Sequence, residues 1–264
     1  MSRLGRIAAE TKAAWHAFLR RRTAVFFTFF FPAILIVIFG ALIRTDPTGG
    51  GLFAEPAGYY VAGYIAVVVL FTPLSRIGSE VARHREGNRF EKLATTPLSR
   101  PEWLFAQTLV NVVVIGLASL VILVMVVLVT DAGFVASPLI VPYIALAVAL
   151  FCGLGALLGR LADSQDGVIA ASNGIAIPLL FLSETFIPPT MLPEWFVPLM
   201  ELSPLTYFAR GLRAATYEPP AGVPAVETGQ AGLVGADPIL NLVVLAVLAV
   251  GFFVAGAYAL PRTD

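Results

Sequence analysis

The feature that most constrains this chain is a series of long apolar segments separated by charged or proline-rich stretches. Six segments approach or exceed the roughly 20 residues that a helix needs to cross a bilayer. They cover residues 23–43, 58–75, 103–130, 138–159, 168–183 and 239–260. Charged residues make up 13 % of the chain, about half the share found in ordinary soluble domains. The sequence therefore predicts an all-α integral membrane protein, with six transmembrane helices and a single domain over residues 1–264.

The distribution of basic residues predicts how these helices are oriented. If the N-terminus is cytoplasmic, 14 of the 17 Lys and Arg residues fall on the cytoplasmic side, and Arg44, Arg210 and Arg213 fall outside. This asymmetry agrees with the positive-inside rule. We therefore expect a multi-pass protein of the plasma membrane with both termini in the cytoplasm. The net charge of zero points to no nucleic-acid partner.

Residues 2–22 are predicted to form an amphipathic helix at the membrane surface. Apolar side chains recur every three or four residues from Leu4 to Phe18, and basic residues lie between and after them. Trp15 falls on the apolar face, at the depth where tryptophan commonly meets lipid headgroups. Membrane lipids are therefore an expected partner of this segment.

The loop at residues 82–102 is predicted to be cytoplasmic and holds the densest charge in the chain. Residues 88–96 can form about two and a half helical turns, and Pro97 ends them because the residue before a proline avoids the helical region. Phe90 and Leu93 share one face of this helix and are expected to be exposed. They either dock on a partner protein or fold back against the bilayer, and the residues alone favour neither.

Three local patterns indicate how the apolar helices begin and pack. Ser99 and Glu102 form a capping-box pattern ahead of the third apolar segment. Gly155 and Gly159, four residues apart, would let another helix approach closely. Cys152 lies in an apolar run and is expected to be a small buried hydrophobic residue.

The segment at residues 184–217 is too apolar for a solvated loop and contains too many prolines to cross the membrane. Residues 192–200 and 204–216 are predicted to form two short helices that lie in the outer leaflet or dip into it. Ser203 and Pro204 have the residue types of an N-cap and a first helical position.

Catalysis is poorly supported by the sequence. The two histidines, His16 and His84, lie in predicted cytoplasmic segments, so neither can act as a base or metal ligand within the bilayer. No phosphate-binding loop of the form GxxxxGK[ST] occurs. We therefore expect no enzyme activity, cofactor or metal in this chain itself. Energy for transport would come from another polypeptide or from an ion gradient.

Glu184 is the residue on which an ion-coupled mechanism would depend. It lies at the outer end of the fifth predicted span, and ionisable groups inside the membrane commonly mark ion pathways. It is either a functional intramembrane carboxylate or a residue at the external interface. An ion-coupled secondary transporter using Glu184 is therefore the alternative function.

The charged loop resembles the E-x-G-x-x-E-x-L-x-x-T-P pattern of the type-two export permeases of the ABC transporter superfamily. The matching positions are Glu86, Gly87, Asn88, Glu91, Leu93, Thr96 and Pro97. A second similarity lies in the outer segment, in LPEW at 192–195 and SPLTY at 203–207, followed by Leu212 and Arg213. The two signatures occur in the family's order and on opposite predicted sides of the membrane, so the resemblance covers nearly the whole chain.

The resemblance implies a drug-exporter-like transmembrane subunit that pairs with a second copy or a related permease. Two copies of a separate ATPase subunit would bind ATP and Mg²⁺ and dock on the coupling helix of the first cytoplasmic loop. The implied coupling residues are Arg85, Glu86, Gly87, Arg89, Phe90, Glu91, Leu93, Thr96 and Pro97, and the implied exit-side residues are Glu184, Trp195, Tyr207 and Arg213. The expected cargo is a hydrophobic or amphipathic drug, lipid or lipid-linked glycan, moved out of the cytoplasm or inner leaflet. Similar members often carry Ser-Gly where this chain has Ser183 and Glu184, so the substrate class is left open.

Overall fold

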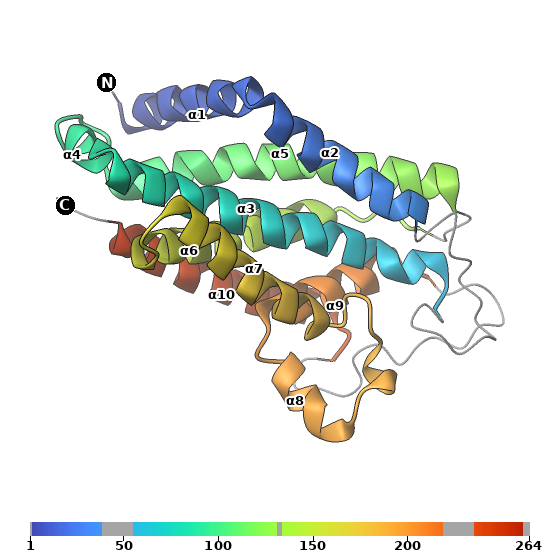
Figure 1. Ribbon diagram of the computed structural model, residues 1–264. Helices are drawn as coiled ribbons and strands as arrows, with labels where there is room; N and C mark the ends of the chain where they lie inside the picture. Colours follow the sequence, from blue (N-terminus) through green and yellow to red (C-terminus); the bar gives the residue numbers. More distant parts are fainter. Residues whose placement is uncertain (1, 39–54, 131–133, 219–234, 261–264) are drawn as a thin grey trace.

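The computed structural model describes residues 2–38, 55–130, 134–218 and 235–260, which fold into helices joined by connecting segments (Figure 1). No strand occurs among these residues, although an isolated bridge joins Phe134 and Tyr217. The α-helices are α1 (Arg3–Arg20), α2 (Arg22–Ile36), α3 (Val61–Glu86), α4 (Arg89–Ala94), α5 (Arg100–Val129), α6 (Ile140–Leu161), α7 (Gln165–Phe181), α8 (Val197–Met200), α9 (Pro204–Thr216) and α10 (Pro238–Ala259). Short 3-10 helices are η2 (Ala57–Tyr60), η3 (Pro189–Met191) and η4 (Glu194–Phe196).

Four helices are long and apolar enough to cross a membrane: α3 with the preceding η2, α5, α6 and α10. They correspond to the second, third, fourth and sixth predicted segments. α2 is a shorter apolar helix, and residues 39–43 of the first predicted segment lie outside the described residues. α7 has 17 residues and contains Pro178. The all-α, membrane-embedded class is confirmed, while the count of six spans stays a prediction.

α3 lies inside the bundle, with other helices around it (Figure 1). Of its most apolar window, 83 % is buried within the fold, against 22 % for α10. Glycines of α6 allow the closest approach to α3: a Cβ at Gly155 would lie 2.6 Å from the Leu74 carbonyl oxygen, and one at Gly159 would collide with Gly78. The close helix packing predicted from these two glycines is therefore confirmed.

α1 packs alongside the first turns of α5 (Figure 1). Near its start, Nη2 of Arg6 donates to the Glu102 carboxylate at 2.8 Å, and near its end Phe18 is buried against Val110 and Val114. The predicted apolar face exists and covers part of α5, while the position of α1 at the membrane surface stays a prediction. The 30 residues of α5 span about 45 Å, which exceeds the roughly 30 Å of a hydrocarbon core. The first half of α5 offers α1 an apolar partner.

The segment between α7 and α10 lies away from α4 (Figure 1). The predicted helix at 192–200 forms as η4 followed by α8, and the predicted helix at 204–216 is α9. α9 packs against α3, α6 and α10, so it is enclosed by the fold. Ser203 occupies the predicted N-cap position, although its side-chain oxygen makes no capping hydrogen bond.

Candidate functional site

The connection between α3 and α5 is built from local signals that separate α4 as a short helix. Asn88 precedes α4 in the left-handed conformation, with φ of 51°, which asparagine adopts more readily than most residues. In the pattern quoted above, the glycine stands two residues after the first glutamate, which is the position of Asn88; the chain departs from the pattern here, and Gly87 lies one residue earlier. α4 then covers Arg89–Ala94, within the predicted 88–96. After Pro97 the predicted capping box is formed, since the Ser99 amide donates to the Glu102 carboxylate at 2.8 Å.

Phe90 is buried, which corrects the expectation that it is an exposed docking side chain. It is 2 % exposed. Its ring centroid lies 5.4 Å from that of His84 in α3 and 5.7 Å from that of Trp103 in α5. The chain supplies this aromatic partner itself because the capping box starts α5 just before Trp103. Phe90 is therefore the anchor of α4, and Leu93 beside it is partly buried.

Arg85 and Glu86 attach the same corner to the connection between α6 and α7. Nη1 of Arg85 donates to three carbonyl oxygens at the end of α6, at 2.8 to 3.1 Å, where a cation is favourable. The Glu86 carboxylate accepts hydrogen bonds from the backbone and side-chain amides of Gln165, the first residue of α7, at 3.2 and 3.3 Å. Arg85 and Glu86, two residues of the predicted coupling set, therefore bind other parts of the same chain.

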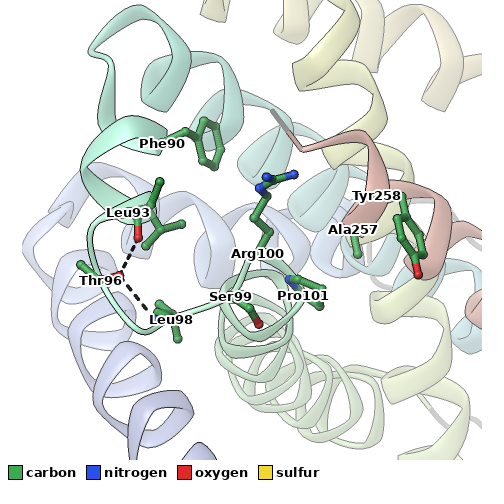
Figure 2. Close-up of a pocket in the computed structure, with 10 residues that line it drawn as sticks. Phe90, Leu93, Thr96, Leu98, Ser99, Arg100, Pro101, Ala257 and Tyr258 are labelled. Atoms are coloured by element: carbon green, nitrogen blue, oxygen red, sulfur yellow. Dashed lines mark hydrogen bonds between the residues drawn. The ribbon is translucent and has the colours of Figure 1, made fainter. Parts of the chain in front are cut away.

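The other members of the predicted coupling set are exposed at this corner. They are Gly87, Arg89, Glu91, Thr96 and Pro97. A groove of about 350 Å³ lies beside them, between α4, the start of α5 and the end of α10. Figure 2 shows Ala257 and Tyr258 on one side of the groove and Phe90 and Leu93 on the other, with Arg100 between them. Sequence reasoning missed the contribution of α10, because no local pattern connects the last span to this loop.

A charged cluster is buried in the outer segment around Glu184. Its carboxylate is enclosed by the fold and pairs with Arg210 of α9, so it is not an exposed surface charge. Arg213, one turn further along α9, donates to the backbone oxygens of Glu184 and Tyr59. Its guanidinium carbon lies 3.7 Å from the centre of the Tyr59 ring. Sequence reasoning missed the pairing of Arg210, although its spacing of three residues from Arg213 places both on one helical face.

The two remaining exit-side candidates lie in different environments. Tyr207 is buried on α9, and its hydroxyl donates to the Glu201 carbonyl oxygen at 2.8 Å. Trp195 is 70 % exposed beside Phe196. The structure therefore brings Glu184 and Arg213 together and leaves Trp195 at the surface.

The profile of a family described as ABC-2 type transporter matches residues 6–217. The chain belongs to this family. No curated protein gives a significant match. The matched range contains both signatures, the α3–α5 connection and the outer segment, and confirms the resemblance to the export permeases. This ABC-2 protein is therefore a membrane-embedded, ABC-type transporter permease.

The two sites described above in this ABC-2 permease are a groove beside α4 and a buried ion pair between Glu184 and Arg210. Among the residues that the structure describes, no group of three or more His, Cys, Asp or Glu side chains is placed to hold a metal ion. Cys152 is a buried free thiol, as its apolar surroundings in the sequence indicate. In α1, burial raises the pKa of the Glu10 carboxyl, which accepts a hydrogen bond from Gln107 at 3.2 Å.

Proposed function

We propose that the chain is the permease subunit of an ATP-driven exporter, and that a separate ATPase subunit docks on α4. The observation that carries the proposal is the attachment of α4. Phe90 holds it to α3 and α5, while Arg85 and Glu86 hold the same corner to α6 and α7. A displacement of α4 is therefore passed to four helices at once.

The surface around α4 suits a protein partner. Leu93 and Tyr258 supply apolar area beside the groove, and Tyr258 is 79 % exposed. Burying such area contributes roughly 25 cal/mol per Å². The exposed charges of Arg89, Glu91 and Lys92 lie at the rim, where complementary charges govern orientation and association rate.

The remaining parts of the proposed assembly follow the family. α2 and α7 complete six spans, both termini are cytoplasmic, and a second copy or a related permease completes the path through the plasma membrane. ATP and Mg²⁺ bind to the ATPase. A hydrophobic or amphipathic cargo, such as a drug, a lipid or a lipid-linked glycan, leaves the cytoplasm or inner leaflet. The hydrogen bond from Arg100 to the Leu260 carbonyl oxygen, at 2.8 Å, supports placing the end of α10 on the same side as α4.

The buried ion pair weighs against the alternative of an ion-coupled carrier. An ion-coupling carboxylate exchanges its ion during the cycle, whereas Glu184 is enclosed and paired with Arg210. Breaking a buried pair costs about 3–5 kcal/mol. This cost favours a structural role for Glu184.

The proposal is tested by recovering the native complex with an affinity tag on the permease. We expect an ATPase to co-purify with the wild-type chain and with Ala94→Ser, and to be lost from Ala94→Trp, because Ala94 is exposed on α4 beside the groove. The matched pair separates steric blocking from general damage. Absence of any ATPase from the wild-type complex, in detergents and in lipid nanodiscs, overturns the proposal.

A further inference from the structure

A crevice between α2, α3 and α7 has the size of a small-molecule site. It is open on one side and has a volume of about 450 Å³, within the range of typical ligand pockets. Its apolar lining includes Phe27 and Phe31 of α2, each about half exposed, and Phe71 of α3. These rings offer a surface on which an apolar chain or ring system can pack.

The polar lining of the crevice forms a stripe along α3. Ser75 and Arg76 lie three and four residues after Thr72 and four and three residues before Ser79, so the four side chains share one face of the helix. Asn173 of α7 lines the same crevice and is exposed. Polar and ionisable side chains are unfavourable against lipid tails and usually face an internal path or cavity. The stripe therefore indicates a ligand with a polar part.

The charged side chains in the lining are both cations, Arg21 and Arg76. Arg21 is paired with Glu80 at 3.2 Å. Arg76 forms no ion pair within 4 Å among the residues described. Its guanidinium is positioned by a 3.4 Å contact with the Asn111 side-chain oxygen and lies 4.7 Å from the centre of the Phe18 ring. Because a guanidinium has five N–H donors, donors remain for an anion.

We propose that this crevice binds an anionic amphiphile, with its carboxylate or phosphate head at Arg76 and its apolar tail along Phe27, Phe31 and Phe71. The inference rests on the proposed function in taking the amphiphile as cargo, and it narrows the cargo to molecules with a negative head. A phospholipid of the surrounding bilayer has the same head chemistry and is the other source of such a ligand.

The test uses the full-length chain in phosphatidylcholine nanodiscs and a fatty acid that carries a photoreactive diazirine in its tail. Labelling of peptides from α2 and α3 is measured by mass spectrometry for the acid and for its neutral methyl ester. We expect the acid to label the wild type about tenfold more than the ester, the size expected of a hydrogen bond between charged groups. Arg76→Gln removes this preference and Arg76→Lys keeps part of it. Arg20→Gln, which changes an exposed arginine outside the crevice, behaves as the wild type.

Equal labelling by acid and ester in the wild type, or an undiminished preference in folded Arg76→Gln, overturns the inference. Adding phosphatidylglycerol to the nanodiscs distinguishes the two sources of ligand. Suppressed labelling identifies a bilayer lipid as the occupant, and persistent labelling identifies a single-chain amphiphile; both agree with an anionic head at Arg76. The labelling experiment needs no ATPase. A negative labelling result therefore does not affect the test of ATPase binding, and a failed co-purification does not affect the labelling test.

Discussion

The two ends of this molecule use the same residue types in opposite ways. At the α4 corner, Arg85 and Glu86 lie near the surface and bind the ends of other helices. In the outer segment, Glu184 and Arg210 are enclosed and pair with each other. Surface ion contacts are worth about 0–1 kcal/mol, whereas losing one partner of a buried pair costs about 3–5 kcal/mol. The pair around Glu184 therefore costs more to break than the contacts that hold the α4 corner.

The largest effect is expected from Glu184→Gln, which leaves the buried Arg210 with only the more distant Glu201 carboxylate, 3.8 Å from its Nη1. We expect a loss of about 3–5 kcal/mol in the free energy of unfolding, measured by thermal and denaturant unfolding in detergent. The double variant Glu184→Leu, Arg210→Met should recover most of it, because an apolar pair needs no compensation. Glu194→Gln changes an exposed carboxylate of the same segment and serves as the control. If Glu184→Gln and Glu194→Gln had the same free energy of unfolding, the buried ion pair would contribute no more to stability than a surface charge.

Phe90→Ala is expected to have the second largest effect, because it removes the anchor of α4. We expect a local loss of about 3 kcal/mol, the lower end for a buried Phe→Ala change, since the aromatic cluster lies near the surface. Trypsin should then cleave after Arg89 and Lys92 faster than in the wild type. Phe90→Leu, which keeps apolar volume, is the matched control. Unchanged cleavage in Phe90→Ala would show that other contacts hold α4.

Glu86→Ala removes both hydrogen bonds to Gln165 at the start of α7. Loss of this capping contact should lower the free energy of unfolding by about 1 kcal/mol. The protein should stay folded, while the rate of ATP-stimulated transport falls. Asp163→Asn, an exposed change in the α6–α7 connection, is expected to leave both unchanged. Stability is read from thermal unfolding and coupling from uptake into inverted vesicles. A transport rate equal to that of Asp163→Asn would separate Glu86 from coupling.

The smallest effect on stability is expected from Glu91→Gln, since Glu91 is exposed on α4. Its free energy of unfolding should stay within about 0.5 kcal/mol of the wild type. The association rate with the ATPase, followed by surface plasmon resonance, should change and lose part of its salt dependence, as expected for a charge at an interface rim. If the variant and the wild type had the same association rate at low salt and again at high salt, Glu91 would lie outside the contact.

Much of the fold follows from local signals. The bounds of α9 agree with the predicted 204–216 because a proline opens the helix and the apolar face continues to its end. The capping box at Ser99 and the close packing at Gly155 are also confirmed, since both depend on residues a few positions apart. Local patterns of this kind need no knowledge of the neighbouring helices.

The incorrect predictions concern which part of the chain packs against a predicted helix face. The face of α4 that carries Phe90 was identified correctly, but its partner Trp103 comes from the next span, and the pattern indicates no partner. Likewise, the pairing of Arg210 with Glu184 was missed, because it requires α9 to fold back against the end of α7. The crevice beside Arg76 was not predicted, because it depends on the positions of α2 and α7 beside α3.

The length of α5 has a consequence for the protein's response to its lipid surroundings. A helix of about 45 Å is mismatched to a hydrocarbon core of roughly 30 Å, and a mismatch is usually relieved by tilting or by deforming the bilayer. Here α1 covers apolar surface along the first half of α5, with Phe18 against Val110 and Val114. The chain therefore carries its own compensation for bilayer thickness.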